Sequence, residues 1–529
     1  MICDDLACEG SDTFDFSGEP LNGQVTLARL SLTCRSLSIA ALRALWRTVR
    51  DMGHFVKYTM PADFWLSGEV FGRSLTPSRL PSEEDLKRFK FYAAFIREMQ
   101  FAGTVTLHDD IYNTLCMACN APVFPNLTRI SWDSSGLNLI YIHYFLCPSI
   151  TSLHITANSV SMGDISILNN VQRRWSSTII DLKIEHPAIT HGTITAFMDT
   201  ICSWRLQRLS LSRIDWSRFA DIASSAALRI LQLGLHGDFD LEIPSTIEFS
   251  ASCTFESLTT LRIGTRMSFQ TCIGMWRASS FACLAHLTIN GLDTEPACWG
   301  ELFAAIRAAH TNPRLLRTLL ISDHLEDDDT PGSGLKDVEE PRFAPLYDFC
   351  ELDDVFLSSR DGFGLTMTTI EGMARAWPRL EELSLMAVSF LENPQLPLNA
   401  LAHLAANCPR LSRLEIDVDA TNMSLKDAPQ APWSPQSALM ALNVNWSSIG
   451  SARPVAAYLL ILFPNLRNVY PMRPASLARD ADVRVKRWDR VQYLLPVLAA
   501  VRDFAIDRDS AVVRWKEFNN DGYGGALDV

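Results

Sequence analysis

The sequence predicts an α/β solenoid of about 13 to 14 irregular repeats, each a short strand followed by a helix. A pattern of the form apolar-x-x-apolar-x-apolar recurs along most of the chain, as in RLQRLSL, CLAHLTI and RLEELSL. Helical patterns such as GELFAAIRAAHT and LNALAHLAANCP separate its copies. One strand and one helix cannot bury both of their apolar faces alone, so the copies are expected to stack.

The spacing of the copies indicates which kind of repeat they form. Thirteen copies have a central apolar residue, and the mean spacing between these residues is about 28 positions. This period and pattern resemble the leucine-rich repeat. Met99, in FIREMQF, marks a plausible further copy upstream. The central residues are Ile130, Leu153, Leu182, Leu209, Leu231, Leu261, Leu287, Leu319, Val355, Leu383, Leu414, Leu442 and Val469.

The composition excludes several classes of function. The formal net charge of −13 argues against a nucleic-acid-binding protein, which would need a basic face. The longest apolar run, VAAYLLILF, is too short to cross a bilayer. The first residues, MICDDLACEG, lack the features of a signal peptide. Together with 13 scattered cysteines, these features predict a protein of the cytosol or nucleus that does not enter a membrane.

Residues 26–49, TLARLSLTCRSLSIAALRALWRTV, predict two short amphipathic helices near the start of the chain. In the first helix the apolar residues step by three or four positions, which places them on one face. A second apolar face follows in SIAALRALWRTV. The residues that carry this pattern, including one off the first stripe, are Leu27, Leu30, Leu32, Cys34, Leu37, Leu42, Leu45 and Trp46.

The pattern L-x-x-L-x-x-x-C-R-x-L, running into A-L-x-x-L-W, resembles the later part of an F-box, whose first helix is not visible upstream. With the repeats, the chain resembles a fungal F-box protein with leucine-rich repeats. The resemblance implies the substrate-recognition adaptor of an SCF-type cullin–RING ubiquitin ligase. The eight residues listed above would belong to the part that docks a Skp-type adaptor, and the repeats would bind an unknown protein substrate. Such a chain is not an enzyme.

Two other interpretations of the helix pair stay open. One is that the pair caps the amino-terminal end of the solenoid. The other is that the protein is a leucine-rich-repeat scaffold that has lost its F-box function and binds a partner without ubiquitin. Neither alternative changes the predicted fold of the repeats.

The repeat register also predicts a partner-binding surface on the concave face. The residue between the last two apolar positions of each copy should point away from the core. Leu320, Phe356 and Tyr470 are the large apolar or aromatic members, so we expect a partner to dock on them, unless irregular repeats or an acidic loop cover them. The full set is Ser131, His154, Lys183, Ser210, Gln232, Arg262, Thr288, Leu320, Phe356, Ser384, Glu415, Asn443 and Tyr470.

The organisation along the chain follows from these assignments. We expect residues 1–22 to be disordered, residues 23–60 to form the F-box-like helices and residues 90–485 to form the solenoid. An acidic segment, residues 322–343, is expected to be a flexible loop. Residues 486–518 are expected to form a capping helix, and residues 519–529 a disordered tail.

Sequence motifs for chemistry are weak. Cys116 and Cys119, in CMAC, have the spacing of half a zinc site, but no second ligand pair is found, so buried thiols are expected. HDD at 108–110 and DHLEDDD at 323–329 lack the alternating spacing of a calcium loop and are expected to be solvated. The sequence therefore predicts no catalytic residue, no metal site and no cofactor.

Overall fold

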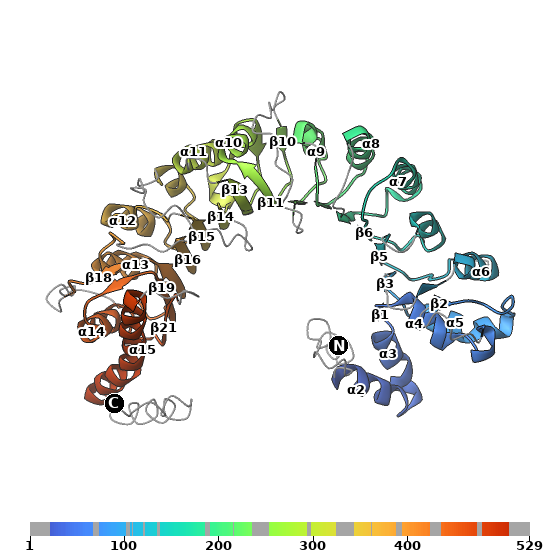
Figure 1. Cartoon of the computed structure of the whole chain (residues 1–529), viewed down its shortest axis with the longest axis horizontal. Helices are drawn as coiled ribbons and strands as arrows, with labels where there is room; N and C mark the ends of the chain where they lie inside the picture. The colour runs from blue at the N-terminus through green and yellow to red at the C-terminus, as the bar shows by residue number, and fades with distance from the viewer. Residues whose placement is uncertain are drawn as a thin grey trace. The chain divides into compact units, whose positions relative to one another are not determined.

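A computed structural model describes most of the chain (Figure 1). Its internal contacts divide the chain into two compact units. The units, Met1–His236 and Gly237–Val529, were not predicted from the sequence and are described separately. The predicted disordered tail and most of 1–22 lie outside the described residues. The described residues are 22–66, 74–101, 106–107, 109–119, 122–134, 138–185, 191–214, 216–234, 253–293, 298–323, 343–360, 362–387, 394–423, 435–472 and 479–506.

The first unit alternates short strands with helices. Its main strands run parallel in the order β1-β3-β5-β6-β7-β8-β9, which is also their order along the chain. The elements are α2 (Asn22–Ser31), α3 (Arg35–Leu45), β1 (Thr48–Val49), α4 (Met52–Thr59), η1 (Ala62–Phe64), β2 (Ser74–Leu75), α5 (Glu83–Ala93), β3 (Glu98–Gln100), β4 (Thr106–Leu107), α6 (Asp109–Cys119), β5 (Arg129–Asp133), η3 (Leu139–Tyr144), β6 (Ser152–Thr156), α7 (Met162–Trp175), β7 (Asp181–Glu185), α8 (His191–Cys202), β8 (Arg208–Leu211), η4 (Trp216–Arg218), α9 (Phe219–Ala223) and β9 (Ile230–Leu233).

The second unit repeats the same arrangement. Its main strands run parallel in the order β11-β13-β14-β15-β16-β17-β19-β21. The elements are β10 (Cys253–Phe255), β11 (Thr260–Ser268), α10 (Phe269–Arg277), β12 (Ser279–Phe281), β13 (His286–Asp293), α11 (Trp299–Ala309), η5 (Pro313–Leu315), β14 (Thr318–Ser322), η6 (Ala344–Asp348), β15 (Asp354–Ser359), α12 (Met367–Ala376), β16 (Glu382–Ala387), η7 (Leu398–Ala400), α13 (Leu401–Asn407), β17 (Arg413–Ile416), β18 (Asp419–Ala420), β19 (Ala441–Asn445), β20 (Ser448–Ile449), α14 (Ala452–Leu462), β21 (Asn468–Pro471) and α15 (Arg479–Ile506).

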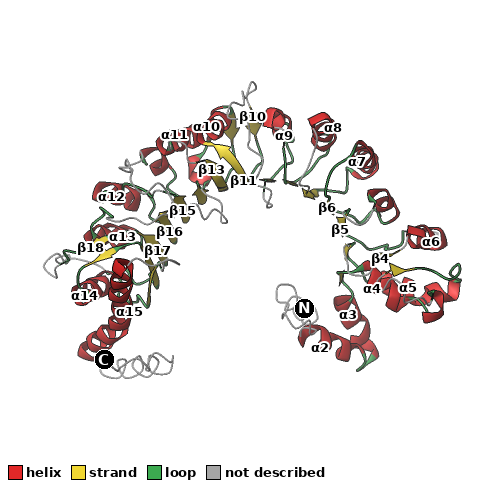
Figure 2. Ribbon diagram, viewed as in Figure 1, coloured by secondary structure: helices red, strands yellow, loops and turns green. Residues whose placement is uncertain are grey.

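The central apolar residue of each repeat is buried and lies in register with that of the next. Leu287 pairs with Leu319, and Leu319 pairs with Val355. Alternate residues of each strand point to opposite faces, so these side chains enter the core between strands and helices. Within each unit the helices that connect successive strands lie on one side of the strand row (Figure 2). The predicted mixed α/β class, with a parallel sheet built by repetition, is confirmed.

In most repeats, one backbone carbonyl just before a main strand accepts two hydrogen bonds from the next repeat. In the first unit, the carbonyl oxygen of Arg97 accepts hydrogen bonds from the N–H groups of Thr128, at 2.7 Å, and Arg129, at 3.0 Å. In the second unit, the carbonyl oxygen of Arg317 accepts from Asp353, at 2.9 Å, and Asp354, at 3.2 Å. This shared acceptor sets where each strand begins, whatever the length of the segment before it.

The sheet of the first unit begins earlier than the range 90–485 that the sequence suggested for the solenoid. β1 pairs with β3, and Met99 pairs with Ile130, so Met99 does mark a further repeat. The Arg47 carbonyl accepts from the N–H groups of Arg97, at 2.8 Å, and Glu98, at 3.0 Å. Residues 48–49, placed by the sequence with the F-box-like helices, are therefore also the first strand of the sheet.

The ends of the acidic segment 322–343 are parts of the fold. Ser322 ends β14, and Ser322, Asp323 and Phe343 are all buried. The Asp323 carboxylate accepts hydrogen bonds from Ser359 Oγ, at 2.8 Å, and from the backbone N–H of Arg360, at 2.7 Å. Residues 324–342, which carry most of the predicted loop, lie outside the described residues.

α15 covers the last strand of the second unit. The helix spans Arg479–Ile506, so it begins before the predicted start at 486, and residues 507–518 lie outside the description. Gln492 Oε1 accepts the N–H of Val469 at 2.5 Å, and Gln492 Nε2 donates to the carbonyl of Arg467 at 2.8 Å. One side-chain amide thus occupies the backbone groups that another strand would use.

Among the described residues, no helix is both long and apolar enough to span a membrane.

Replacing Gln492 with alanine should destabilise the second unit. The substitution removes the partners of one donor and one acceptor at the edge of β21, which should cost about 1 to 2 kcal/mol in free energy of unfolding. Urea unfolding followed by circular dichroism measures this loss, and light scattering detects association through the exposed edge. Arg490→Ala, on the exposed side of the same helix, is the control. Equal stability of the two variants would contradict the role given to Gln492.

Candidate functional site

The two amino-terminal helices form a small layer with its own apolar contact. Leu27 of α2 and Ala41 and Ala44 of α3 are buried against each other, and Leu30 and Leu45 pack around them. The polar residues of the two helices lie outside this contact, as the amphipathic pattern predicts. The helix pair is therefore held together by an apolar seam that includes three of the eight residues selected from the sequence, together with Ala41 and Ala44, which were not selected.

The structure divides the eight predicted adaptor-binding residues into two groups. Leu27 is fully buried, so its role is in the seam. Leu30, Leu42, Leu45 and Trp46 are partly buried.

The second group lies around the turn from α2 to α3. Leu32 is 86% exposed, Leu37 is 42% exposed and Cys34 is exposed. Ile39, which the sequence reasoning did not select, is 41% exposed on α3. These side chains make the turn an apolar surface in contact with water, in contrast to the buried seam.

Trp46 joins α3 to the first repeat. Its ring centroid lies 5.8 Å from that of Phe55 in α4 and 4.9 Å from that of Tyr92 in α5. Aromatic contacts of this kind fix relative orientation as well as burying surface. The position of Trp46 therefore depends on where α4 and α5 are held.

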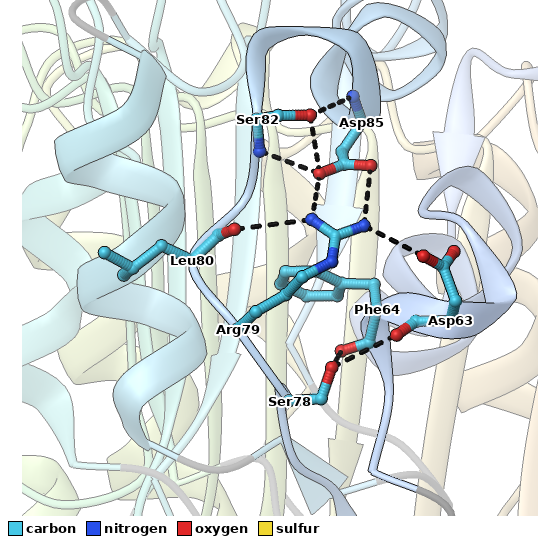
Figure 3. Close-up of polar contacts among 7 residues, drawn as sticks. All are labelled: Asp63, Phe64, Ser78, Arg79, Leu80, Ser82 and Asp85. Atoms are coloured by element: carbon cyan, nitrogen blue, oxygen red, sulfur yellow. Dashed lines mark hydrogen bonds and ion pairs between the residues drawn. The ribbon is translucent and has the colours of Figure 1, made fainter.

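An arginine fixes the start of α5 (Figure 3). Arg79 Nη1 lies 2.5 Å from Asp85 Oδ2, while Arg79 Nη2 lies 3.1 Å from both Asp85 Oδ1 and Asp63 Oδ2. Ser82 and Asp85 also form a capping box at the amino-terminal end of α5. The hydrogen bonds from Arg79 and then Ser82 hold the pKa of the Asp85 carboxyl well below its usual range.

Replacing Arg79 with alanine should lower the melting temperature of the first unit at pH 7. The substitution leaves the Asp85 carboxylate with its capping bonds alone. Because the folded pKa of Asp85 is depressed, this carboxylate stabilises the fold above its unfolded pKa, and the contribution is lost as the pH falls through the folded value. The melting difference between the two proteins should therefore shrink in strong acid.

Leu80→Ala is the matched control for this experiment. Leu80 lies beside Arg79 in the chain and its side chain is 81% exposed, so its removal should leave the melting temperature nearly unchanged. A melting temperature of Arg79→Ala equal to that of the control would mean that the cluster does not hold α5.

The residues predicted for the partner surface do lie in register on the strand face, the sheet surface that the helices do not cover. Leu320 pairs with Phe356, which makes them neighbours on β14 and β15. Tyr470, which is 54% exposed, lies four strands further along the row, about 19 Å from Phe356. The three residues therefore belong to the same row of the face without forming one continuous apolar patch.

Polar side chains separate Phe356 from Tyr470. Glu415 accepts hydrogen bonds from Ser384 Oγ, at 2.8 Å, and from Asn443 Nδ2, at 2.7 Å. Both oxygens of this carboxylate are thereby held by neutral donors. The row thus presents an apolar pair, a hydrogen-bonded polar trio and then a single tyrosine.

The strand face of the second unit also carries two adjacent carboxylates. Asp354 of β15 pairs in register with Glu382 of β16. Burial, followed by the charges of Glu382 and Asp353, raises the pKa of Asp354 to about 6. Arg413 lies 3.3 Å from Glu382 and partly offsets the repulsion. In the described part of the chain, no side chain forms an ion pair with Asp354.

Asp354→Asn should stabilise the second unit at neutral pH. Because the folded pKa of Asp354 is raised from 3.8 to about 6, the folded state holds this proton more tightly, and stability falls as the pH rises through that window. Removing the charge should add about 1 kcal/mol above pH 6, after allowance for partial exposure, and little below pH 4.

Urea unfolding between pH 4 and 8 tests this profile. Asp348→Asn is the control, since the Asp348 carboxylate lies 2.5 Å from Arg307 Nε and should give no stabilisation when removed. A gain for Asp354→Asn that is the same at pH 4 and pH 8 would contradict the electrostatic cause.

A polar network on the strand face of the first unit was missed from the sequence. Ser131, His154 and Glu185 come from three neighbouring strands, with 3.4 Å between Ser131 Oγ and His154 Nδ1 and 3.1 Å between His154 Nε2 and Glu185 Oε2. Glu185 also lies 2.5 Å from Lys183 Nζ. Although burial raises the pKa of Glu185, Lys183 and His154 bring it below its usual value. A carboxylate shared in this way fits a charged recognition surface better than a hydrolytic triad.

The cysteine and acidic motifs noted in the sequence do not come together in a common site among the described residues. Cys116 and Cys119 lie on α6 and are partly buried, and burial, followed by the charge of Cys119, raises the pKa of Cys116 to about 12. Such a thiol stays protonated and is a poor metal ligand. Asp109 and Asp110 begin α6, while His108 and residues 324–329 lie outside the description. Within the described ranges, no group of three or more metal-ligating side chains is found.

Comparison with known proteins gives structural likenesses only. No family model matches the sequence, and no curated protein matches it. A chain in the crystal structure of the Rad7 and Elc1 complex from yeast is similar at 14% sequence identity. The likeness covers 73% of this chain and 79% of that chain, with a TM-score of 0.38. At that level it bears on neither the family nor the function of this protein.

Proposed function

We propose that this protein is a leucine-rich-repeat substrate-recognition adaptor of an SCF-type cullin–RING ubiquitin ligase. In this function, α2 and α3 act as an F-box-like element that docks a Skp-type adaptor, and the strand face binds a protein substrate. The chain performs no bond chemistry and needs no cofactor. It acts in the cytosol or nucleus by holding two proteins close together, which raises their effective concentration.

The exposed apolar turn between α2 and α3 is the observation that carries the adaptor role. Leu32 and Leu37 are exposed while Leu27 is fully buried, so the helix pair has both a core and a separate apolar surface. Exposed apolar side chains that lie next to one another, in contrast to single ones, are typical of surfaces that bind another protein. The proposal therefore assigns the adaptor contact to Leu32, Cys34 and Leu37, with Ile39 beside them, and leaves Leu27 in the seam.

One further observation favours the alternative, a repeat scaffold that binds a partner without ubiquitin. Trp46 packs on Phe55 and Tyr92, and the Arg47 carbonyl starts the strand ladder. A helix pair continuous with the first repeat is also what an amino-terminal cap would look like. The two functions differ in whether the exposed turn binds a Skp-type adaptor.

Replacing Leu32 and Leu37 together with aspartate should abolish co-purification with a Skp-type adaptor and cullin. The two charges would have to be buried in an apolar contact, so affinity should fall at least about 100-fold. Because both side chains are exposed in the free chain, the melting temperature should stay within a few degrees of the unsubstituted protein. Quantitative pull-down and thermal melting measure the two effects.

Met117→Asp is the control, because Met117 is 81% exposed on α6, away from the α2–α3 turn. It should retain adaptor binding. If the unsubstituted protein captures neither a Skp-type adaptor nor cullin, the scaffold function is the correct one.

A further inference from the structure

The strand face of the second unit combines an apolar pair with acidic neighbours. Leu320 and Phe356 are side by side in register and partly exposed. Asp354 lies two residues before Phe356 on β15, so both side chains point to the same face, about 6.6 Å apart along the strand. Glu382 lies beside Asp354 on β16.

The charges around this pair do not balance. The carboxylates of Asp354, Glu382 and Glu415 share the face with two guanidiniums, that of Arg413, which lies 3.3 Å from Glu382, and that of Arg262 on β11, two strands from Leu320. Glu415 is held by a hydroxyl and an amide, both neutral. In the described residues, two of the three carboxylates therefore have no cation in contact.

We propose that this face binds an extended segment of a partner protein that carries a basic side chain and an apolar side chain two residues apart. The apolar side chain packs on Leu320 and Phe356, and the basic one pairs with Asp354. The inference rests on the proposed function in taking the strand face as the partner surface, and it adds the chemical class of the partner.

Spacing supports this occupant. In an extended segment, side chains two residues apart also point to one side, about 6.6 Å apart. This matches the separation of the acid and the ring on β15. A cation placed at Asp354 would offset the repulsion from Glu382, so the interaction gains from charge as well as from buried apolar area.

Charge also argues against other occupants. Residues 324–342 follow β14 directly and contain seven acidic residues against two basic ones, so as a cover they would add negative charge. A nucleic acid would be repelled in the same way. A second copy of this chain, with its net charge of −13, is likewise a poor electrostatic match.

Binding of short synthetic peptides to the full-length protein tests the proposal. The probe is a fluorescent 12-residue peptide that repeats Lys-Ser-Leu, and its two references repeat Glu-Ser-Leu and Lys-Ser-Ser. We expect the Lys-Ser-Leu peptide to bind at least about tenfold more tightly than either reference, because both the charge and the apolar side chain contribute. Fluorescence anisotropy at low and physiological salt measures the affinities.

Variants of the protein locate the contact. Asp354→Lys and Phe356→Ser should each weaken binding of the Lys-Ser-Leu peptide by about tenfold or more. Glu301→Lys makes the same change in net charge on α11, where Glu301 is 57% exposed on its side chain, and should leave binding unchanged. Thermal melting of each variant confirms that it is folded.

Several results would overturn the proposal. These are no binding of the Lys-Ser-Leu peptide at millimolar concentration, equal binding of either reference peptide, or equal loss in the Glu301→Lys control. The peptide assay contains no Skp-type adaptor or cullin. A failure of adaptor binding at Leu32 and Leu37 therefore leaves the result at Asp354 and Phe356 unaffected, and the two failures are distinguishable.

Discussion

The architecture depends on a carbonyl oxygen that accepts two consecutive N–H groups from the next repeat. The carbonyls of Arg97 and Arg317 show this arrangement in the first and second units. A carbonyl has two lone pairs, so both bonds are satisfied without distorting the strand. Because the link sits at the strand entrance, the segments between strands can vary widely in length without shifting the register of the central apolar residues.

This constraint also explains how the helix pair is attached. The same link at Arg47 places the end of α3 at the first strand, and Trp46 then meets the rings of Phe55 and Tyr92. The cluster around Arg79 holds α5 and thereby one of those rings. The exposed turn at Leu32 is thus presented from a fixed base, which limits the orientations that a bound protein could adopt.

Much of the repeat region could be predicted from the sequence because its signal is local. Leu319 and Val355 carry the same pattern as their neighbours, and alternation along a strand is enough to assign their burial. The burial of the leucines in the helix pair was harder to predict. Leu27 is buried and Leu32 is exposed because α3 packs against one and not the other, and the local pattern does not show this. The register predicted that Ser384, Glu415 and Asn443 lie on the same face as Phe356 and Tyr470. The distance between Phe356 and Tyr470 could not be predicted in this way, because it depends on the order of the strands.

Other features have no local signal at all. Ser131, His154 and Glu185 lie on separate repeats, and only the stacking of strands brings them together. The division of the chain near residue 236 likewise has no mark in the repeat pattern.

The side chain of Gln492 closes the strand row of the second unit at its last strand. Its amide satisfies the donor of Val469 and the acceptor of Arg467, so no further repeat can be added after β21 without displacing α15. An array finished in this way can lengthen only by duplication of units inside it. Variation in repeat number among descendants of such a gene would then be confined to the interior, with the helix that bears Gln492 retained as the last element.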